Sequence, residues 1–273
     1  MWSQQALELA PDCPAAIAAV DMALWDLLGK EQGVPLFRLW GGRGEPIATS
    51  VTIGICSIEQ TLAEAAAWLA KGFHVLKVKI GEELEVDIER IRKIRELAGP
   101  NIMLRVDANQ GFDLAGAREL LRRTADMNVE MLEQPLPQDV LADAAVLTTE
   151  SAVPIVADES ASGLAECMQV VDRCAAHAIN IKLMKCGGPT VALRIHDYAR
   201  DAGMSLMLGC NDETRISIAA GVHLAQSMPA LRYADLDGHM DLASDPSSGG
   251  FDIRDGMLYL QETPGLGVTV DRW

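Results

Sequence analysis

The chain has 273 residues, and its 39 Asp and Glu against 23 Lys and Arg give a formal net charge of −16. That charge repels phosphate backbones and anionic lipid surfaces, so we expect neither nucleic acid nor membrane partners. Hydrophobic residues make up 49% of the chain, which is typical of a globular protein with a large core.

The sequence carries none of the patterns that mark export or metal-binding cysteines. The first ten residues lack a basic segment followed by an apolar one, so we expect no signal peptide. The six cysteines form no C-x-x-C pair and no zinc-finger spacing with histidine, which indicates reduced thiols. These features predict a cytoplasmic protein.

The N-terminal segment differs from the rest of the chain. Residues 15–32 have a strong apolar helix pattern, with Pro14 well placed at the first turn, and residues 35–40 add another turn. We therefore expect residues 1–44 to lie outside the main domain.

From about residue 45, short apolar runs alternate with longer stretches of helical spacing. Strands are predicted at 47–53, 75–80, 103–106, 130–132, 155–157, 178–181, 205–208 and 231–234. Helices are predicted at 58–71, 84–97, 114–127, 164–174, 191–202 and 216–226. Eight alternating units predict an α/β fold in which residues 45–235 form a parallel, TIM-like barrel. Residues 236–273, with short strands at 251–253 and 257–260, should pack outside it.

Ionisable residues end five consecutive predicted strands, at intervals of 28, 26, 25 and 24 residues. They are Lys79, Asp107, Glu133, Asp158 and Lys182. The carboxyl ends of parallel barrel strands share one rim, where barrel enzymes build their sites. The spacing therefore predicts a charged site at this rim.

Three carboxylates on one rim repel each other unless a cation lies between them. Oxygen ligands alone suit a hard ion, so Asp107, Glu133 and Asp158 are predicted to bind Mg²⁺. The alternative is that each carboxylate caps the helix that follows it.

The lysines suggest proton transfer. Lys77 and Lys79 point to the same face of their strand, and a nearby ammonium or metal lowers the pKa of a lysine until it can act as a base. Lys182 lies four strands further round, on the opposite side of the expected metal. A carbon between Lys79 and Lys182 could lose a proton to one and regain it from the other. The alternative is that either lysine only pairs with a carboxylate. We also expect Lys77 to contact the substrate.

These motifs together resemble the enolase superfamily, and within it the muconate lactonizing enzyme subgroup. They are the K-x-K at Lys77, the D-A-N at Asp107, the E-Q-P at Glu133, the A-D-E-S at Asp158 and the N-I-K-L-M-K containing Lys182. The resemblance implies a (β/α)7β barrel, Mg²⁺ on the three carboxylates, and Lys79 and Lys182 as the acid/base pair. It also implies that residues 15–40 are the remnant of an α+β capping domain in an N-terminally shortened member.

Within the subgroup the chain is most similar to dipeptide epimerases. Asp235 and Asp237 resemble their D-x-D motif, which binds the α-ammonium of a dipeptide; the alternative is that both are turn residues. Asp212 is predicted to receive a cationic substrate side chain, unless it points away. Glu213 matches a carboxylate of the family and is expected to orient Lys182 or a substrate group.

The sequence therefore predicts a Mg²⁺-dependent epimerase that moves the α-proton of the C-terminal residue of a dipeptide, with cationic dipeptides as one hypothesis. One alternative is a lyase with the same catalytic parts, either a muconate-type cycloisomerase or an o-succinylbenzoate synthase. Another is an inactive barrel remnant that binds a metal or a partner subunit. The sequence leaves open whether the chain forms a homo-oligomer.

Overall fold

The computed structural model of the chain describes residues 2–271, which form two compact units. The central unit comprises Ser50–Ala161 and Glu166–Asn180. The terminal unit comprises the chain up to Thr49, Ser162–Ala165 and the chain from Ile181 onward. The boundaries that the sequence suggests, at residues 44/45 and 235/236, stay predictions.

The parallel strands follow each other in sequence order from β2 to β9, as predicted. The central unit holds β2 (Val51–Ile53), β3 (Val75–Lys79), β4 (Met103–Asp107), β5 (Val129–Glu133) and β6 (Ile155–Ala157). The chain passes from the central to the terminal unit within β7 (Ala178–Lys182). The terminal unit continues with β8 (Ser205–Gly209) and β9 (Leu231–Ala234).

The register of the central strands aligns the predicted site residues. Lys79 is the Cα partner of Asp107, and Asp107 is the partner of Glu133. Because paired residues on neighbouring strands point to the same face, these three side chains share one face of the sheet. The opposite face carries buried apolar residues such as Val106 and Leu132.

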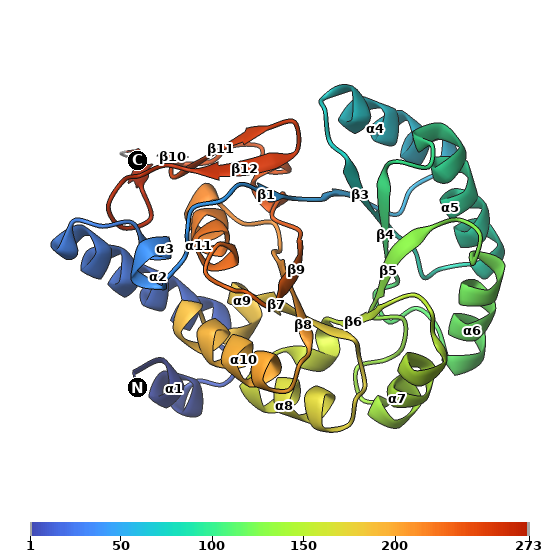
Figure 1. The fold of residues 1–273 in the computed structure, drawn as a ribbon, viewed down its shortest axis with the longest axis horizontal. Helices are drawn as coiled ribbons and strands as arrows, with labels where there is room; N and C mark the ends of the chain where they lie inside the picture. Colours follow the sequence, from blue (N-terminus) through green and yellow to red (C-terminus); the bar gives the residue numbers. More distant parts are fainter. Residues whose placement is uncertain (1, 272–273) are drawn as a thin grey trace. The chain divides into compact units, whose positions relative to one another are not determined.

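Helices cover that apolar face (Figure 1). They are α4 (Ile58–Ala70), α5 (Leu84–Ala98), α6 (Leu114–Arg123) and α7 (Leu141–Glu150). Ser57 and Gln60 form a reciprocal capping box at the start of α4, and the Asp113 carboxylate accepts a hydrogen bond from Gly116 N at the start of α6. A short 3-10 turn, η1 (Glu159–Ala161), and α8 (Leu164–Asp172) follow β6.

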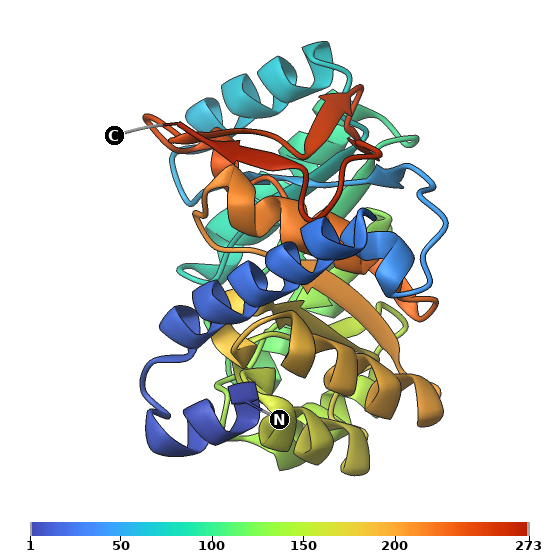
Figure 2. The same cartoon turned by 90° about the vertical axis from the view of Figure 1, so that its left-hand side faces the viewer.

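The terminal unit begins with α1 (Trp2–Leu9), α2 (Pro14–Gln32) and α3 (Leu36–Leu39), so the predicted helix at 15–32 is confirmed. Its later helices are α9 (Leu183–Cys186), α10 (Pro189–Asp201) and α11 (Arg215–Ala225). Helix α2, in blue, lies across α10 and α11 (Figure 2).

The C-terminal part of this unit contains η2 (Gly238–Met240) and four short strands. They are β10 (Ser247–Gly249), β11 (Phe251–Arg254), β12 (Met257–Leu260) and β13 (Val268–Val270). The strands predicted at 251–253 and 257–260 are therefore confirmed.

Two predicted elements are wrong in extent. The single strand expected at 47–53 is divided, because Thr49 N donates to Gly256 O and the Thr49 hydroxyl accepts from Leu236 N. Its first part is β1 (Ile47–Ala48), which pairs antiparallel with β12. The helix expected at 114–127 ends at Arg123, where the Thr124 hydroxyl donates to Leu120 O. Helix α7 has no counterpart among the predicted ranges.

Two general features of the described chain bear on the predictions. All six cysteines are free thiols, as expected. Over residues 2–271, none of the helices combines the length and the apolar character required to span a bilayer.

A buried histidine joins α3 to α11 within the terminal unit. The ring of His223 stacks on Phe37 with centroids 5.8 Å apart, and its Nδ1 accepts a hydrogen bond of 3.1 Å from Phe37 N. Burial lowers the pKa of His223 to about 4. The neutral ring is therefore the form that this packing accommodates.

We expect the free energy of unfolding to fall as the pH drops from about 6.5 to about 4, because the unfolded chain then takes up a proton that folded His223 refuses. The contribution of this group is at most about 3 kcal/mol. Urea unfolding at pH 7 and pH 4.5 measures it, and His223→Gln should show a shallower loss. Burial also lowers the pKa of His239 to about 4, so some acid sensitivity should remain in the variant. If the free energy of unfolding fell equally with pH in the two proteins, the acid sensitivity could not be assigned to His223.

Candidate active site

Three buried carboxylates lie at the carboxyl ends of neighbouring strands in the central unit. Asp107 ends β4, Glu133 ends β5, and Asp158 directly follows β6. Their exposed fractions are 1%, 0% and 2%. Since ionised groups are costly to bury without partners, such a cluster requires compensating charge or hydrogen bonds.

Lys77 supplies part of that compensation. Its ammonium nitrogen lies 3.1 Å from Asp107 Oδ2 and 2.8 Å from Glu133 Oε2, and the side chain is itself buried. Lys77 therefore bridges two of the three predicted metal ligands. The contact with substrate that the sequence suggested for Lys77 stays a prediction.

Lys79 follows two residues later on the same strand and the same face. It is the last residue of β3, and it is half-buried where Lys77 is fully enclosed. The two lysines of the K-x-K motif thus occupy different depths. A base that must reach a substrate suits the outer position, at Lys79.

Two polar residues in this cluster were missed by the sequence analysis. Asn180, fully buried on β7, donates from Nδ2 to Glu133 Oε1 at 2.6 Å. Gln134 accepts at Oε1 from Asp158 N at 2.8 Å and from Ser160 N at 3.1 Å. Asn180 could have been found from its position two residues before Lys182, which places both on one face of the strand. Gln134 follows Glu133 and has a φ of 35°. Its contacts with Asp158 N and Ser160 N depend on this left-handed backbone conformation.

The residue types of the cluster fit a hard divalent cation, because carboxylate oxygens are the donors that Mg²⁺ prefers. Across residues 2–271, however, no three or more His, Cys, Asp and Glu side chains are grouped so as to hold a metal ion. The Mg²⁺ site on Asp107, Glu133 and Asp158 therefore stays a prediction. Its support is the donor chemistry and the shared strand ends.

The terminal unit places Lys182 at the end of β7, half-buried and at the start of α9. Glu213, buried after β8, accepts hydrogen bonds from Asn211 N at 2.8 Å and from the Ser217 hydroxyl. Burial raises the pKa of Glu213, against the opposing influence of these hydrogen bonds and of the Lys182 ammonium. Glu213 is thus close enough to Lys182 to feel its charge, which supports the expected orienting role.

Asp235 and Asp237 follow β9 in the same unit and are only 2% and 6% exposed. The Cys210 thiol donates to Asp237 Oδ1 at 3.8 Å and accepts from Gly238 N at 3.3 Å. Burial and the carboxylates of Asp237, Asp235 and Glu213 raise the pKa of Cys210 well above its usual range. The pair is therefore a buried acidic group beside a neutral thiol, and not an exposed turn.

A glycine brings the loops after β8 and β9 together. A Cβ at Gly238 would lie 2.0 Å from Asn211 O, so no larger residue fits without moving the backbone. This contact holds the loop of Asp212 and Glu213 against the loop of Asp235 and Asp237.

Asp212 is exposed, and it lies near a carboxylate that the sequence analysis missed. Burial and the charge of Asp212 raise the pKa of Asp241. Two carboxylates that repel each other at an accessible position are suited to a cationic group. The only hint in the sequence was the recurrence of acidic residues in D-L-D-G-H-M-D.

The predicted site residues thus form two groups. Lys77, Lys79, Asp107, Glu133 and Asp158 belong to the central unit. The terminal unit contains Lys182, Asp212, Glu213, Asp235 and Asp237. The predicted placement of Lys79 and Lys182 on opposite sides of a metal stays a prediction.

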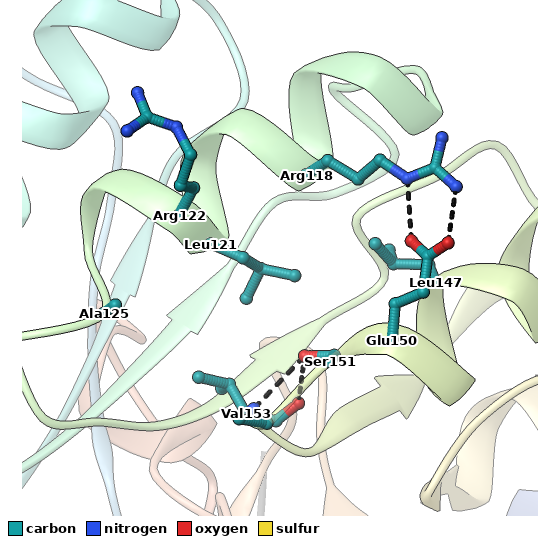
Figure 3. Close-up of a pocket in the computed structure, with 9 residues that line it drawn as sticks. Arg118, Leu121, Arg122, Ala125, Leu147, Glu150, Ser151 and Val153 are labelled. Carbon is teal, nitrogen blue, oxygen red and sulfur yellow. Dashed lines mark hydrogen bonds and ion pairs between the residues drawn. The ribbon is translucent and has the colours of Figure 1, made fainter.

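A separate hollow of about 350 Å³ lies between α6 and α7 in the central unit (Figure 3). Arg118 and Glu150 line it together with Leu121 and Leu147, and Arg118 forms two hydrogen bonds of 2.7 Å with Glu150. It contains none of the predicted site residues, so we do not assign the chemistry to it.

The protein belongs to the class of α/β-barrel enzymes. Its parallel strands alternate with helices, and carboxylates and lysines lie at the strand ends. A family model described as "Enolase C-terminal domain-like" matches residues 60–273, and one described as "Mandelate racemase / muconate lactonizing enzyme, N-terminal domain" matches residues 3–41. The chain belongs to the enolase superfamily, as its motifs suggested.

The chain is similar to several epimerases. It is 47% identical over 262 residues to the L-Lys-D/L-Arg epimerase of Methylococcus capsulatus, covering 96% of this chain and 74% of that protein. A crystal structure of a dipeptide epimerase from Methylococcus capsulatus, complexed with Mg and the dipeptide L-Arg-D-Lys, matches with a TM-score of 0.94 and 45% identity over 98% of this chain and 76% of the other.

A substrate-liganded L-Ala-D/L-Glu epimerase from Bacillus subtilis matches with a TM-score of 0.92 and 35% identity, covering 94% of this chain and 73% of the other. These likenesses confirm the predicted fold class, a (β/α)7β barrel with part of a capping domain, and the predicted similarity to dipeptide epimerases.

Proposed function

We propose that this protein is a Mg²⁺-dependent dipeptide epimerase, an isomerase that inverts Cα of the C-terminal residue. The observation that carries the proposal is the buried pair Asp235 and Asp237. Two carboxylates beside each other suit the α-ammonium of a free dipeptide, whereas the dianionic substrate of a muconate-type lyase would be repelled. The similarity to named epimerases supports the same choice.

We further propose cationic dipeptides as the preferred substrates. Asp212 and Asp241 offer carboxylates at an accessible position, where a lysine or arginine side chain of the substrate would relieve their repulsion. The Methylococcus capsulatus relative, at 47% identity, is named an L-Lys-D/L-Arg epimerase. L-Lys-L-Arg is therefore the first substrate to test.

In the proposed mechanism, Asp235 and Asp237 hold the substrate ammonium and thereby orient the C-terminal residue. Asp107, Glu133 and Asp158 would hold Mg²⁺, which neutralises charge on the substrate carboxylate and so makes the α-proton more acidic. One of Lys79 and Lys182 removes that proton from one face, and the other lysine returns a proton to the opposite face. Lys77 contacts the carboxylates of Asp107 and Glu133 and so holds them in place.

The full chain, incubated with Mg²⁺ and L-Lys-L-Arg in D₂O, should incorporate deuterium at Cα of arginine and accumulate L-Lys-D-Arg. Mass spectrometry and chiral chromatography measure the two products. L-Ala-L-Glu and hydrophobic dipeptides serve as comparison substrates. Absence of exchange on every dipeptide, together with turnover of a dianionic acid, would favour the lyase. Metal binding without any exchange would favour an inactive barrel.

Asp212→Ala should lower kcat/KM for L-Lys-L-Arg about fivefold, because an accessible ion pair contributes about 1 kcal/mol. The value for L-Ala-L-Glu should not fall, since that substrate places no cation there. Steady-state kinetics on both dipeptides measure the effect. Equal losses on the two substrates would remove the cationic assignment, and Asp252→Ala on the exposed face of β11 is the matched control.

We also propose that the enzyme acts in the cytoplasm on a small-molecule substrate. Six free thiols favour a reducing compartment, and the net charge of −16 disfavours nucleic acids and anionic membranes.

A further inference from the structure

A buried aspartate from a helix contacts the segment that follows each proposed lysine base, two residues after Lys79 and eight residues after Lys182. Asp87 on α5 contacts the turn after Lys79, and Asp21 on α2 contacts the segment after Lys182. Each pair lies within one unit: Asp87 and Lys79 in the central unit, Asp21 and Lys182 in the terminal unit. Neither aspartate has a part in the proposed chemistry.

Asp87 is fully buried, and its Oδ2 accepts a hydrogen bond of 2.9 Å from Gly81 N. Gly81 lies two residues after Lys79 and has a φ of 115°, in the region that only glycine adopts readily. The other partner of Asp87 is Arg90. Arg90 donates from Nη1 to Asp87 Oδ1 at 2.5 Å and from Nη2 to Cys56 O at 2.9 Å. Asp87 is thus held by Arg90 and in turn holds the end of the Lys79 strand.

The packing around this turn leaves little room for movement. A Cβ at Gly81 would lie 2.3 Å from Ala108 O, and one at Gly111 would lie 2.3 Å from Gly81 O. Ile80 N also donates to Asp107 O at 2.8 Å. The turn after Lys79 therefore rests directly against the loop that follows Asp107.

Asp21 is 4% exposed and contacts Thr190, the second residue of α10, twice. Its Oδ2 accepts from Thr190 N and its Oδ1 from the Thr190 hydroxyl, both at 2.8 Å. Trp25, one turn further along α2, donates from Nε1 to the same hydroxyl at 2.9 Å. Asp21 thus caps α10 from another helix, 169 residues away in sequence.

A short, closed turn connects this cap to Lys182. Gly187 N and Gly188 N both donate to Leu183 O at 3.1 Å, so the chain from Lys182 to α10 is folded tightly on itself. A Cβ at Gly188 would lie 2.8 Å from the Asp21 side chain. Helix α2 therefore packs directly on the segment that begins at Lys182.

We propose that Asp87 and Asp21 are positioning residues, Asp87 for Lys79 and Asp21 for Lys182. The inference rests on the proposed two-lysine reaction. Each aspartate acts on the backbone that carries one lysine, so its loss should impair proton transfer by that lysine more than by the other. Displacing a catalytic group by about one ångström costs about 100-fold in rate. A difference between the two lysines should therefore be measurable even if the structure relaxes in part.

The test follows each epimer separately. L-Lys-L-Arg and L-Lys-D-Arg are incubated in D₂O with the full chain and Mg²⁺, and the initial rate of deuterium entry at Cα is measured for each. Lys79→Ala and Lys182→Ala first assign each lysine to the epimer whose exchange it initiates. Asp21→Ala should then slow exchange of the Lys182 epimer at least about tenfold more than that of the Lys79 epimer.

The central unit should show the opposite bias. Asp87→Leu/Arg90→Met removes both partners of the buried ion pair, which avoids leaving Arg90 buried and unpaired. It should slow the Lys79 epimer at least about tenfold more than the Lys182 epimer. Arg90→Lys keeps a cation beside Asp87 and leaves the Gly81 hydrogen bond in place, so it should show no such bias.

Two variants separate positioning from general destabilisation. Asp26→Ala removes a hydrogen bond that α2 makes to the C-terminal segment, from Leu266 N to Asp26 Oδ1, and not to the segment after Lys182. It also removes the exposed ion pair between Asp26 and Lys30. It should slow both epimers equally or not at all. Asp21→Asn keeps an acceptor for Thr190 N and should restore most of the balance lost in Asp21→Ala. Equal losses for the two epimers in Asp21→Ala and in the double variant would overturn the proposal.

A second measurement is independent of activity. Amide hydrogen exchange, followed by mass spectrometry on the full chain, should rise in residues 182–190 for Asp21→Ala and in residues 79–84 for the double variant. Unchanged exchange in these segments would overturn the proposal. If wild-type protein exchanged neither epimer, the proposed function would fail, and the amide data would still decide whether the aspartates order the two segments.

Discussion

Lys79→Ala and Lys182→Ala are each expected to lower the rate of epimerisation on the order of 1000-fold, since a positioned general acid or base contributes about 10²- to 10⁴-fold. Each variant should still exchange the α-proton of one epimer with solvent, because the remaining lysine can remove that proton and return a deuteron to the same face. The two variants should spare opposite epimers.

The measurement is the pair of initial exchange rates with L-Lys-L-Arg and L-Lys-D-Arg in D₂O, beside the rate of inversion. Lys185→Ala is the matched control, because Lys185 lies three residues after Lys182, on the short helix α9 that follows it. It should retain both rates. If the two lysine variants lost exchange of the same epimer, the lysines would not act on opposite faces, and the two-base mechanism would have to be abandoned.

Asp235→Asn and Asp237→Asn should each reduce kcat/KM for L-Lys-L-Arg about 100-fold. Removing one partner of a buried charge contact costs about 2–5 kcal/mol, and each factor of ten corresponds to about 1.4 kcal/mol. Asn preserves the shape of each side chain and, at Asp237, an acceptor for the Cys210 thiol, while removing the charge, so the loss measures the charge itself.

An N-acetylated dipeptide gives the complementary measurement. It lacks the α-ammonium, so the wild-type enzyme should process it poorly, and the Asn variants should lose little further on it. Asp252→Asn, at an exposed aspartate on β11, is the control for removing one negative charge from the chain. Wild-type rates in both Asn variants would show that Asp235 and Asp237 do not form the ammonium receptor, and would favour the lyase.

The structure also separates the roles of the two lysines in the K-x-K motif. Lys77 is enclosed and within ion-pair distance of Asp107 and Glu133, whereas Lys79 lies at the strand end and is partly accessible. An ammonium group between two buried carboxylates offsets their charge and reduces the repulsion between them. The residue two positions later is then the one placed to meet a substrate.

Most of the fold was predictable because its signals are local. Strands alternate with helices at a spacing of one βα unit, and this spacing places Asp107 and Glu133 at the ends of β4 and β5. The errors arose where a contact distant in sequence ended an element. Thr49 leaves the strand pattern because it bonds to Gly256 and Leu236, and nothing near Thr49 in the sequence indicates those partners.

By itself, the sequence determined the order of the parallel strands, the identity of the polar residues at their ends and the family. Those features depend on period-two alternation and on short-range spacing, both of which can be read along the chain. Only the tertiary structure decided that Lys77 bridges Asp107 and Glu133, that Asn180 bonds to Glu133, and that Asp21 caps a helix 169 residues away. Such contacts depend on strand register and on the packing of distant helices, which bring together side chains that no local pattern relates.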